Sequence, residues 1–146
     1  MTTREEPRSR PSAEPKTVLC FGGSPTWGFD PRGGENVVRY GFAERWTRRL
    51  RAELGPSCYV IEDGLSGRTT VFEDPVLGSR IGLAQLPTAR QTHIPVDLVV
   101  ILPGSSYAKA SFGVNSYDIT RCLSRRLDVV AKSNCGPGGN APQTRS

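Results

Sequence analysis

A single serine follows an apolar run near the start of the chain, in the segment VLCFGGSPTWG at positions 18–28. Two glycines, Gly22 and Gly23, allow the backbone to turn sharply before Ser24, and Pro25 comes next. This order is typical of a chain that leaves a buried strand and presents one hydroxyl at the strand's carboxyl end. A serine in such a place can act as a nucleophile on a carbonyl carbon, provided that a base takes its proton.

Two other interpretations fit the same loop. Glycine, serine and proline also favour an ordinary turn. A phosphate-binding loop would follow a strand in the same way, but the segment lacks the GxGxxG and GxxxxGK[ST] spacings. The loop alone leaves both the nucleophile and the plain turn open.

Two further loops combine glycine with short polar residues after an apolar run. They are IEDGLSGRTT at 61–70 and LPGSSYAK at 102–109. Because the carboxyl ends of parallel strands meet at one edge of a sheet, we expect both loops to converge on Ser24. Backbone N–H groups there, that of Gly67 among them, can stabilise negative charge on a neighbouring oxygen. Three ordinary turns would fit the same pattern.

The elements that must position these loops alternate between two kinds of pattern. The predicted strands are 17–21 (TVLCF), 58–61 (CYVI) and 96–102 (VDLVVIL). They are almost continuously apolar, as strands buried on both faces of a parallel sheet are. Helical spacing of apolar residues covers 42–54, 86–92 and 119–130. This alternation predicts an α/β fold with a parallel sheet and right-handed crossovers.

The helix ends carry their own signals. Gly55 and Pro56 end the first helical pattern. Pro87 falls in the first turn of the second, where proline is tolerated. Asn115 or Ser116 is expected to cap the third.

With 146 residues, the chain is long enough for one compact domain. Residues 1–15 and 136–146 are polar and rich in proline or glycine, so we predict two disordered tails around a domain at 16–135. The net charge is +5 and the pI about 9.3. The arginines predict solvated helix faces and no nucleic-acid partner. They are Arg45, Arg48, Arg49, Arg51, Arg121, Arg125 and Arg126.

Other classes are disfavoured by what the sequence lacks. No charged-then-apolar leader or bilayer-length apolar run is present, which predicts a cytoplasmic protein without a membrane partner. Four cysteines without CxxC spacing and one histidine, His93, predict no metal site and no cofactor. Cys20, Cys58 and Cys122 lie in apolar surroundings and are expected to be core thiols.

Five segments together resemble the SGNH/GDSL-type hydrolases, in particular the bacterial arylesterase/acyltransferase-like branch. The segments are VLCFGGSPTWGFDP, RYGFAERW, VIEDGLSGRTTVFEDP, LPTARQTHIPVDLVVILPGSSYAKASFGV and GPGGNAP, in that order over 17–142. The resemblance implies a flavodoxin-like three-layer α/β fold, incomplete at its carboxyl-terminal side. It also implies a serine esterase lineage acting on a small ester or acyl substrate.

The resemblance assigns roles to individual positions. Ser24 stands at the nucleophile position of the family's Gly-Asp-Ser-Leu block, with Gly23 and Pro25 replacing its aspartate and leucine. The oxyanion hole would comprise Ser24, Gly67 and Ser106, where Ser106 replaces the asparagine of Gly-Thr-Asn-Asp. A shorter side chain at 106 reaches less far toward an oxyanion.

The family's general base is the histidine of an Asp-x-x-His block, which these 146 residues do not contain. His93 precedes the third strand, at a position that the family does not use for catalysis, so we interpret it as a structural or surface residue. We therefore predict an ester hydrolase lineage with lost or severely impaired activity. The alternative is a non-catalytic remnant that binds a small acyl ligand. It could instead bind a partner chain, or a second copy, along an exposed edge of the third strand.

Overall fold

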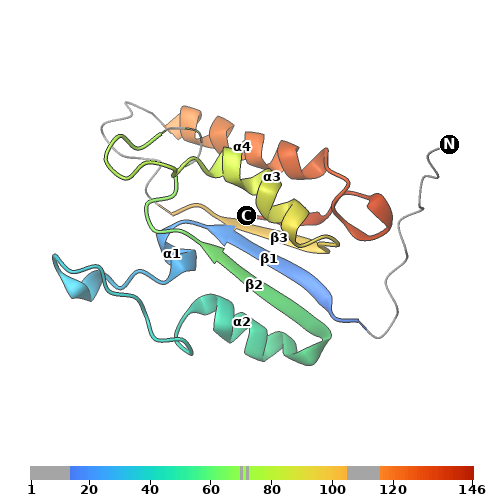
Figure 1. Ribbon diagram of the computed structural model, residues 1–146, viewed down its shortest axis with the longest axis horizontal. Coiled ribbons are helices and arrows are strands. Elements are labelled where there is room, and N and C mark those ends of the chain that lie inside the picture. Colours follow the sequence, from blue (N-terminus) through green and yellow to red (C-terminus); the bar gives the residue numbers. More distant parts are fainter. Residues whose placement is uncertain (1–13, 70, 72, 105–115) are drawn as a thin grey trace.

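The computed structural model describes residues 14–69, 71, 73–104 and 116–146 (Figure 1). Its strands are β1 (Lys16–Gly22), β2 (Cys58–Gly64), β3 (Leu98–Leu102) and β4 (Gln143–Arg145). They form one parallel sheet in the order β2-β1-β3-β4. The α-helices are α1 (Ser24–Trp27), α2 (Trp46–Leu54), α3 (Gly82–Thr92) and α4 (Ser116–Ala131). Short 3-10 turns cover Pro31–Gly33, Gly55–Ser57 and Pro137–Gly139.

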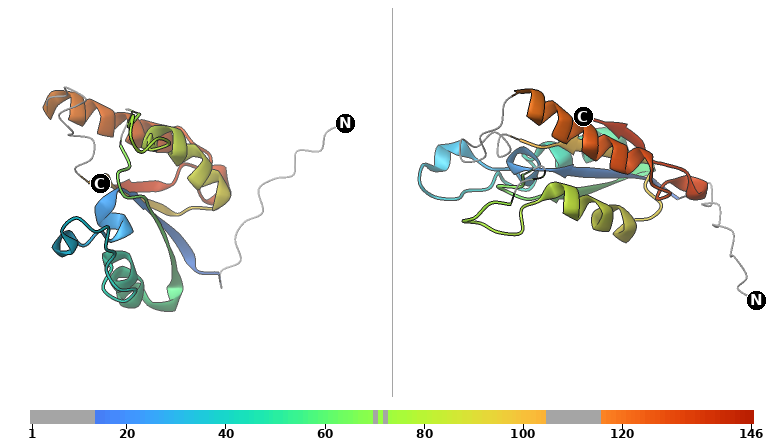
Figure 2. Two further views of the ribbon diagram at one scale, coloured as in Figure 1. Left: turned by 60° about the vertical axis from the view of Figure 1, so that its left-hand side comes forward. Right: turned by 90° about the horizontal axis from the view of Figure 1, so that it is seen from above.

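Helices cover both faces of the sheet (Figures 1 and 2). Successive residues of a strand point to opposite faces, and both sets on β1 are apolar. Leu19 and Phe21 pack in the cluster on the side of α3 and α4. Val18 and Cys20 pack on the opposite side, against the α2 face. The predicted three-layer α/β fold with a parallel sheet is confirmed.

The carboxyl ends of three strands lie at one level. Gly22 at the end of β1 pairs in register with Gly64 of β2 and with Leu102 of β3. The three loops that follow these residues therefore start from the same edge of the sheet. This is the arrangement that the sequence predicted.

Two helices begin elsewhere than expected. α3 begins at Gly82, four residues before the predicted start, so Pro87 lies inside the helix. The Gly82 N–H donates to the carbonyl of Thr69 at 3.1 Å, and this long-range contact fixes the first turn without leaving a pattern in the sequence. α2 begins at Trp46, because the chain still turns at 42–45. Phe42 is 62% exposed and stacks under Arg48.

The expectation of a disordered tail over 136–146 differs from the structure, which places a 3-10 turn and β4 there. Main-chain hydrogen bonds hold β4, and the Gln143 N–H donates to the carbonyl of Asp97 at 2.9 Å. Polar side chains are common on edge strands, so the sequence of β4 has no apolar pattern that would predict a strand. β4 pairs with 98–100, so the bare apolar edge predicted for β3 is occupied along those three residues. Residues 1–13 of the other predicted tail lie outside the described residues.

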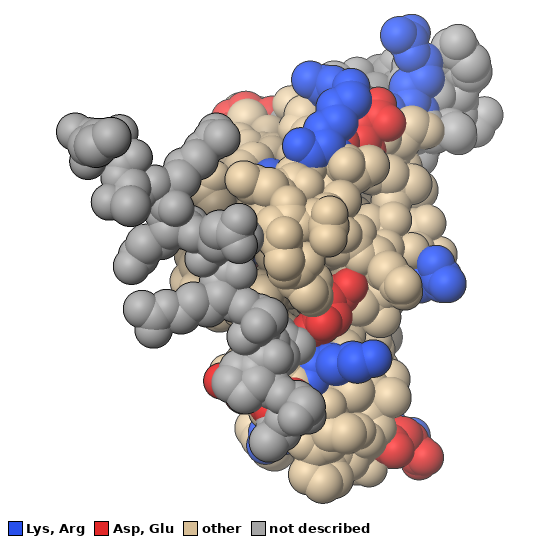
Figure 3. Space-filling model, turned by 90° about the vertical axis from the view of Figure 1, so that its right-hand side faces the viewer, with Lys and Arg blue, Asp and Glu red and all other residues tan. Residues whose placement is uncertain are grey.

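Of the predicted core thiols, Cys20 is fully buried and Cys58 half-buried, while the side chain of Cys122 is not described. On the face seen in Figure 3, basic and acidic side chains of the described residues are interspersed. None of the helices in the described part of the chain has the length and apolarity needed to span a bilayer.

Candidate active site

Ser24 begins α1 directly after β1 ends. The Gly23 N–H donates to the carbonyl of Leu102 at 3.0 Å, which holds the β1 terminus against β3. At the end of this short helix, the Gly28 and Phe29 N–H groups donate to the carbonyl of Ser24 at 2.9 and 3.0 Å. Ser24 is half-buried, with its hydroxyl at the carboxyl edge of the sheet.

The second loop brings Gly67 to this hydroxyl. The Arg68 N–H donates to the carbonyl of Leu65 at 3.0 Å, closing a four-residue turn. Gly67 occupies its third position with φ +80°, the conformation that a type II turn requires and that glycine adopts without strain. The turn does not use the Gly67 N–H, which donates to the Ser24 Oγ at 3.5 Å. Two of the three predicted site residues therefore meet.

The third loop passes directly over the first. A Cβ built on Gly23 would overlap the carbonyl oxygen of Pro103, and one on Gly104 would lie 3.5 Å from the Ser24 nitrogen. The predicted convergence therefore holds as far as Gly104. Ser106, the third predicted site residue, lies outside the described residues, as does the rest of this loop to 115.

A cavity of about 430 Å³ opens beside Ser24. Its walls come from the start of α1, the segment that follows α1, and the start of α2. The lining residues are Ser24, Pro25, Gly28, Phe29, Pro31, Tyr40, Glu44, Arg45 and Trp46. The wall is largely apolar and aromatic, as in pockets for small organic ligands. The sequence did not predict that Phe29, Tyr40 and Trp46 line a cavity, because their part in this wall depends on how the 29–45 segment folds back.

His93 lies at the other end of the sheet from Ser24. It follows α3, which returns from the carboxyl edge to the amino edge before β3 begins. Just after it, the Asp97 N–H donates to the carbonyl of Thr17 at the start of β1. His93 is half-buried there and makes no described contact with Ser24.

Arg68 is a site residue that the sequence reasoning missed. It is 6% exposed and stacks over the ring of Phe21 at 4.0 Å. Its guanidinium donates to Gly22 O, Asp63 O, Asp63 Oδ1 and Gln85 Oε1 at 2.7–3.0 Å. Burial lowers the pKa of this guanidinium, and Asp63 opposes the shift. In the sequence, the only indication of this role is that an arginine lies inside a glycine-rich loop.

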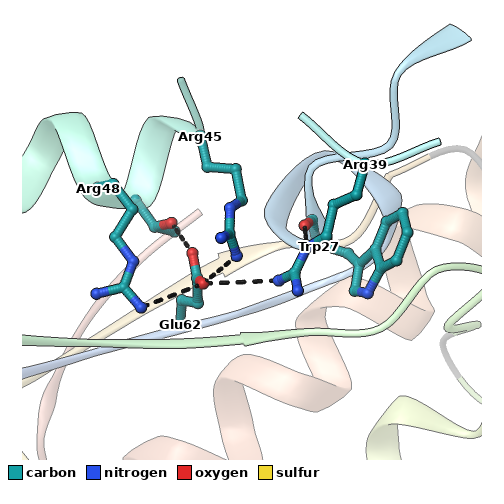
Figure 4. A network of polar contacts seen from close by, with 6 residues as sticks. Trp27, Arg39, Arg45, Arg48 and Glu62 are labelled. Carbon is teal, nitrogen blue, oxygen red and sulfur yellow. Dashed lines mark hydrogen bonds and ion pairs between the residues drawn. The ribbon is translucent and has the colours of Figure 1, made fainter. Parts of the chain in front are cut away.

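A second network surrounds Glu62 on β2 (Figure 4). Its carboxylate accepts from Arg45 Nη1 at 2.5 Å and from the Thr47 hydroxyl. Arg48 and Arg39 approach the same carboxylate at 3.4 and 3.6 Å. Arg39 also donates to the carbonyl of Trp27 at 2.6 Å, so the network ties the end of α1 to the start of α2.

The prediction that the helical arginines form solvated faces is wrong at two positions. Arg45 is 9% exposed and Arg126 fully buried. Arg45 pairs with Glu62, and Arg126 donates to the carbonyl of Thr69. A buried guanidinium needs such partners, and they come from distant segments.

Among the described residues, no group of three or more His, Cys, Asp or Glu side chains could hold a metal ion.

Solved structures resemble this arrangement closely. Est24, a carbohydrate acetylesterase from Sinorhizobium meliloti, superposes with a TM-score of 0.82 at 36% identity. The aryl esterase of M. smegmatis gives 0.82 at 38% identity. Both alignments cover 88% of this chain and 61% of the solved chain, so the chain spans less than two thirds of these relatives. AlinE4, an SGNH-hydrolase family esterase, shares the fold with a TM-score of 0.58 at 19% identity.

The chain resembles the SGNH/GDSL-type hydrolases in fold and in sequence. No protein-family model matches it, and no curated protein gives a significant match. Within this SGNH/GDSL framework, the structure shows what replaces the side chain of the family's first aspartate. The carbonyl of Pro103 fills the space beside Gly23 where that side chain would begin.

Proposed function

We propose that this SGNH/GDSL-type chain descends from a serine ester hydrolase and that its 146 residues alone are inactive or severely impaired. In the ancestral reaction, Ser24 Oγ attacks an ester carbonyl carbon while a base accepts the hydroxyl proton. The N–H groups of Gly67 and Ser24 hold the oxyanion that develops on the carbonyl oxygen. Ser106 occupies the position of a third donor.

The observation that carries this proposal is the 3.5 Å approach of the Gly67 N–H to Ser24 Oγ. An N–H group that faces the nucleophile from another loop is the element from which an oxyanion hole is built. The start of α1 adds the Ser24 N–H, because Pro25 has no N–H and the Thr26 and Trp27 N–H groups donate to the carbonyl of Gly23. The 36–38% identity to two solved esterases gives independent support for this lineage.

The impairment follows from the groups around Ser24. The one histidine of these 146 residues lies at the opposite edge of the sheet, so it cannot take the proton of Ser24. Without a base, a serine hydroxyl stays protonated and reacts slowly. Ser106 also replaces the asparagine donor. Removal of one oxyanion-hole donor lowers the rate of hydrolysis by about 10²–10³-fold, and we expect a loss of this size here.

The hydrolysis of p-nitrophenyl acetate by the purified chain tests this proposal. Ser24→Ala is the critical variant, and Ser66→Ala removes a neighbouring hydroxyl that makes no described contact with Ser24. We expect all three proteins to hydrolyse the ester at near-background rates. Turnover that Ser66→Ala retains and Ser24→Ala loses would contradict the impairment and would mean that Ser24 is still activated.

The cavity beside Ser24 favours a second function, the binding of a small acyl compound without turnover. Its volume of about 430 Å³ and its aromatic wall suit a short ester. Trp46 lines the cavity, so its fluorescence reports binding when the chain is titrated with methyl butyrate. A saturable change that Trp46→Phe abolishes would support this function, and no change would exclude it for this ligand.

A further inference from the structure

Arg68 uses a single guanidinium to join three elements beneath the site. Its Nη1 donates to Gly22 O at 3.0 Å and to Asp63 O at 2.7 Å, near the ends of β1 and β2. Its Nε donates to Gln85 Oε1 on α3 at 2.8 Å. With Nη2 paired to Asp63 Oδ1 at 2.9 Å, four of its five N–H groups donate to the protein.

The contact with Gly22 fixes both ends of the turn that carries Gly67. The Leu65 N–H, at the start of this turn, also donates to Gly22 O, at 3.1 Å. The first residue and the last residue of the turn are thus attached to one carbonyl, two residues before Ser24. The distance between the Gly67 N–H and the Ser24 hydroxyl depends on this shared acceptor.

A second arginine touches the same turn without this effect. Arg80 Nε donates to Ser66 O at 3.1 Å, but its Nη1 donates to Gly78 O, in the same loop region. Arg80 therefore links the turn to another part of its own loop and does not link it to β1. Only the Arg68 guanidinium, among the contacts described, connects the turn to the β1 terminus through a side chain.

We propose that Arg68 is a positioning residue that sets the approach of the Gly67 N–H to the Ser24 hydroxyl. The inference deepens the proposed function, and a catalytic role of the Gly67 N–H rests on that function. The position of this N–H can be measured without ester turnover. Lysine would keep the positive charge yet could not span the acceptors on β1, β2 and α3, because only the planar guanidinium presents several donors at fixed angles. The positioning role therefore requires arginine.

The test is nuclear magnetic resonance of the full chain with Arg68→Lys and Arg68→Met. The readout is the Cβ chemical shift of Ser24, the carbon that bears the hydroxyl. The amide shift of Gly23, which shares a peptide group with the Gly22 carbonyl, reports separately on the direct contact of Arg68 with β1. Arg90→Met is the matched control, since Arg90 is also 6% exposed and lies on α3 beside Cys135. Thermal unfolding of each variant measures the loss of stability separately.

We expect the Ser24 Cβ resonance to shift in both Arg68 variants and to keep its wild-type position in Arg90→Met, although each variant is less stable. A Ser24 Cβ resonance at its wild-type position in folded Arg68→Lys would overturn the proposal and leave Arg68 a purely structural residue. Arg68→Lys keeps the charge and much of the contact with Phe21, so it decides the question if Arg68→Met does not fold. Because no readout needs ester turnover, an inactive Ser24 and a wrong assignment of Arg68 give different results.

Discussion

The main-chain N–H of Gly67 lies 3.5 Å from the hydroxyl oxygen of Ser24, although 43 residues separate them in the sequence. The alignment of Gly22 with Gly64 at the ends of β1 and β2 produces this meeting, because both loops start at the same level. The donor is a main-chain group. The direction of this N–H therefore depends on the conformation of the turn. The turn requires a glycine at position 67, where φ is +80°.

Gly67→Ala should destabilise the chain and displace this donor. The positive φ strains any residue with a Cβ by roughly 1 kcal/mol, and the new Cβ would lie 2.6 Å from Leu77 Cδ1. Gly78→Ala is the matched control, because Gly78 has φ +62° and open space around it. Urea unfolding should show a larger loss of stability for Gly67→Ala. Equal losses would mean that the turn adapts to the added methyl group.

Gly23→Asp restores the residue that the family's Gly-Asp-Ser-Leu block carries at this position, yet we expect it to destabilise the chain. The Cβ would overlap the carbonyl of Pro103, which is main chain and cannot rotate away. Gly34→Asp tests aspartate at a glycine with nothing within 4 Å, where the φ of +62° adds backbone strain but no overlap. Urea unfolding should give Gly23→Asp a lower free energy of unfolding than both the wild type and Gly34→Asp. A Gly23→Asp variant as stable as the wild type would show that the third loop moves freely.

The sequence predicted those features that follow from local pattern. The continuous apolar character of 17–21 and 96–102 indicated strands buried on both faces, and the glycine-rich loops after them indicated the edge where a site could form. Ser24 and Gly67 were found in this way, with their roles implied by the family resemblance.

Features that depend on long-range contacts could not be predicted. β4 is polar and held by main-chain hydrogen bonds, so 136–146 resembled a tail. Arg45 and Arg126 carry the same charge as solvated arginines and differ only in having distant partners. Arg68 is hidden for the same reason, since its acceptors lie on three separate elements.

Glu62→Gln should destabilise the fold strongly. Glu62 is 10% exposed and faces Arg45, Arg48 and Arg39, so its neutralisation leaves buried positive charge without a counterion (Figure 4). Removing one partner of a buried ion pair costs about 3–5 kcal/mol. Glu44→Gln is the control, because Glu44 is exposed and, among the hydrogen bonds of the described residues, accepts one from the Gly41 N–H. Denaturant unfolding that shows equal, small effects for both variants would contradict a stabilising role for the network.

Cys20 should make the fold sensitive to alkaline pH. Burial, and secondarily the charge of Glu62, raises the pKa of this thiol from 9.0 to about 12. Below pH 9 the thiol is protonated in both the folded and the unfolded state, so it contributes no pH dependence. Between about pH 9 and pH 12 only the unfolded state loses the proton, so the free energy of unfolding falls by up to about 1.4 kcal/mol per pH unit.

Cys20→Ala isolates this effect. The variant should be less stable at pH 7, because it leaves a cavity in the core, but its stability should fall less steeply above pH 9. Urea unfolding at several pH values measures both slopes. Identical slopes would show that Cys20 does not retain its proton in the folded state.

β4 should limit self-association by covering the apolar edge of β3. Gln143→Pro removes the N–H that donates to Asp97 O and should detach β4, exposing the edge at 98–100 to a second copy. Thr144→Pro is the matched control, because alternation along a parallel strand directs its N–H away from β3, where proline is tolerated. We expect light scattering to show concentration-dependent association for Gln143→Pro only. A monomeric Gln143→Pro protein would mean that β3 needs no cover, and association of both variants would mean that proline disrupts more than one hydrogen bond.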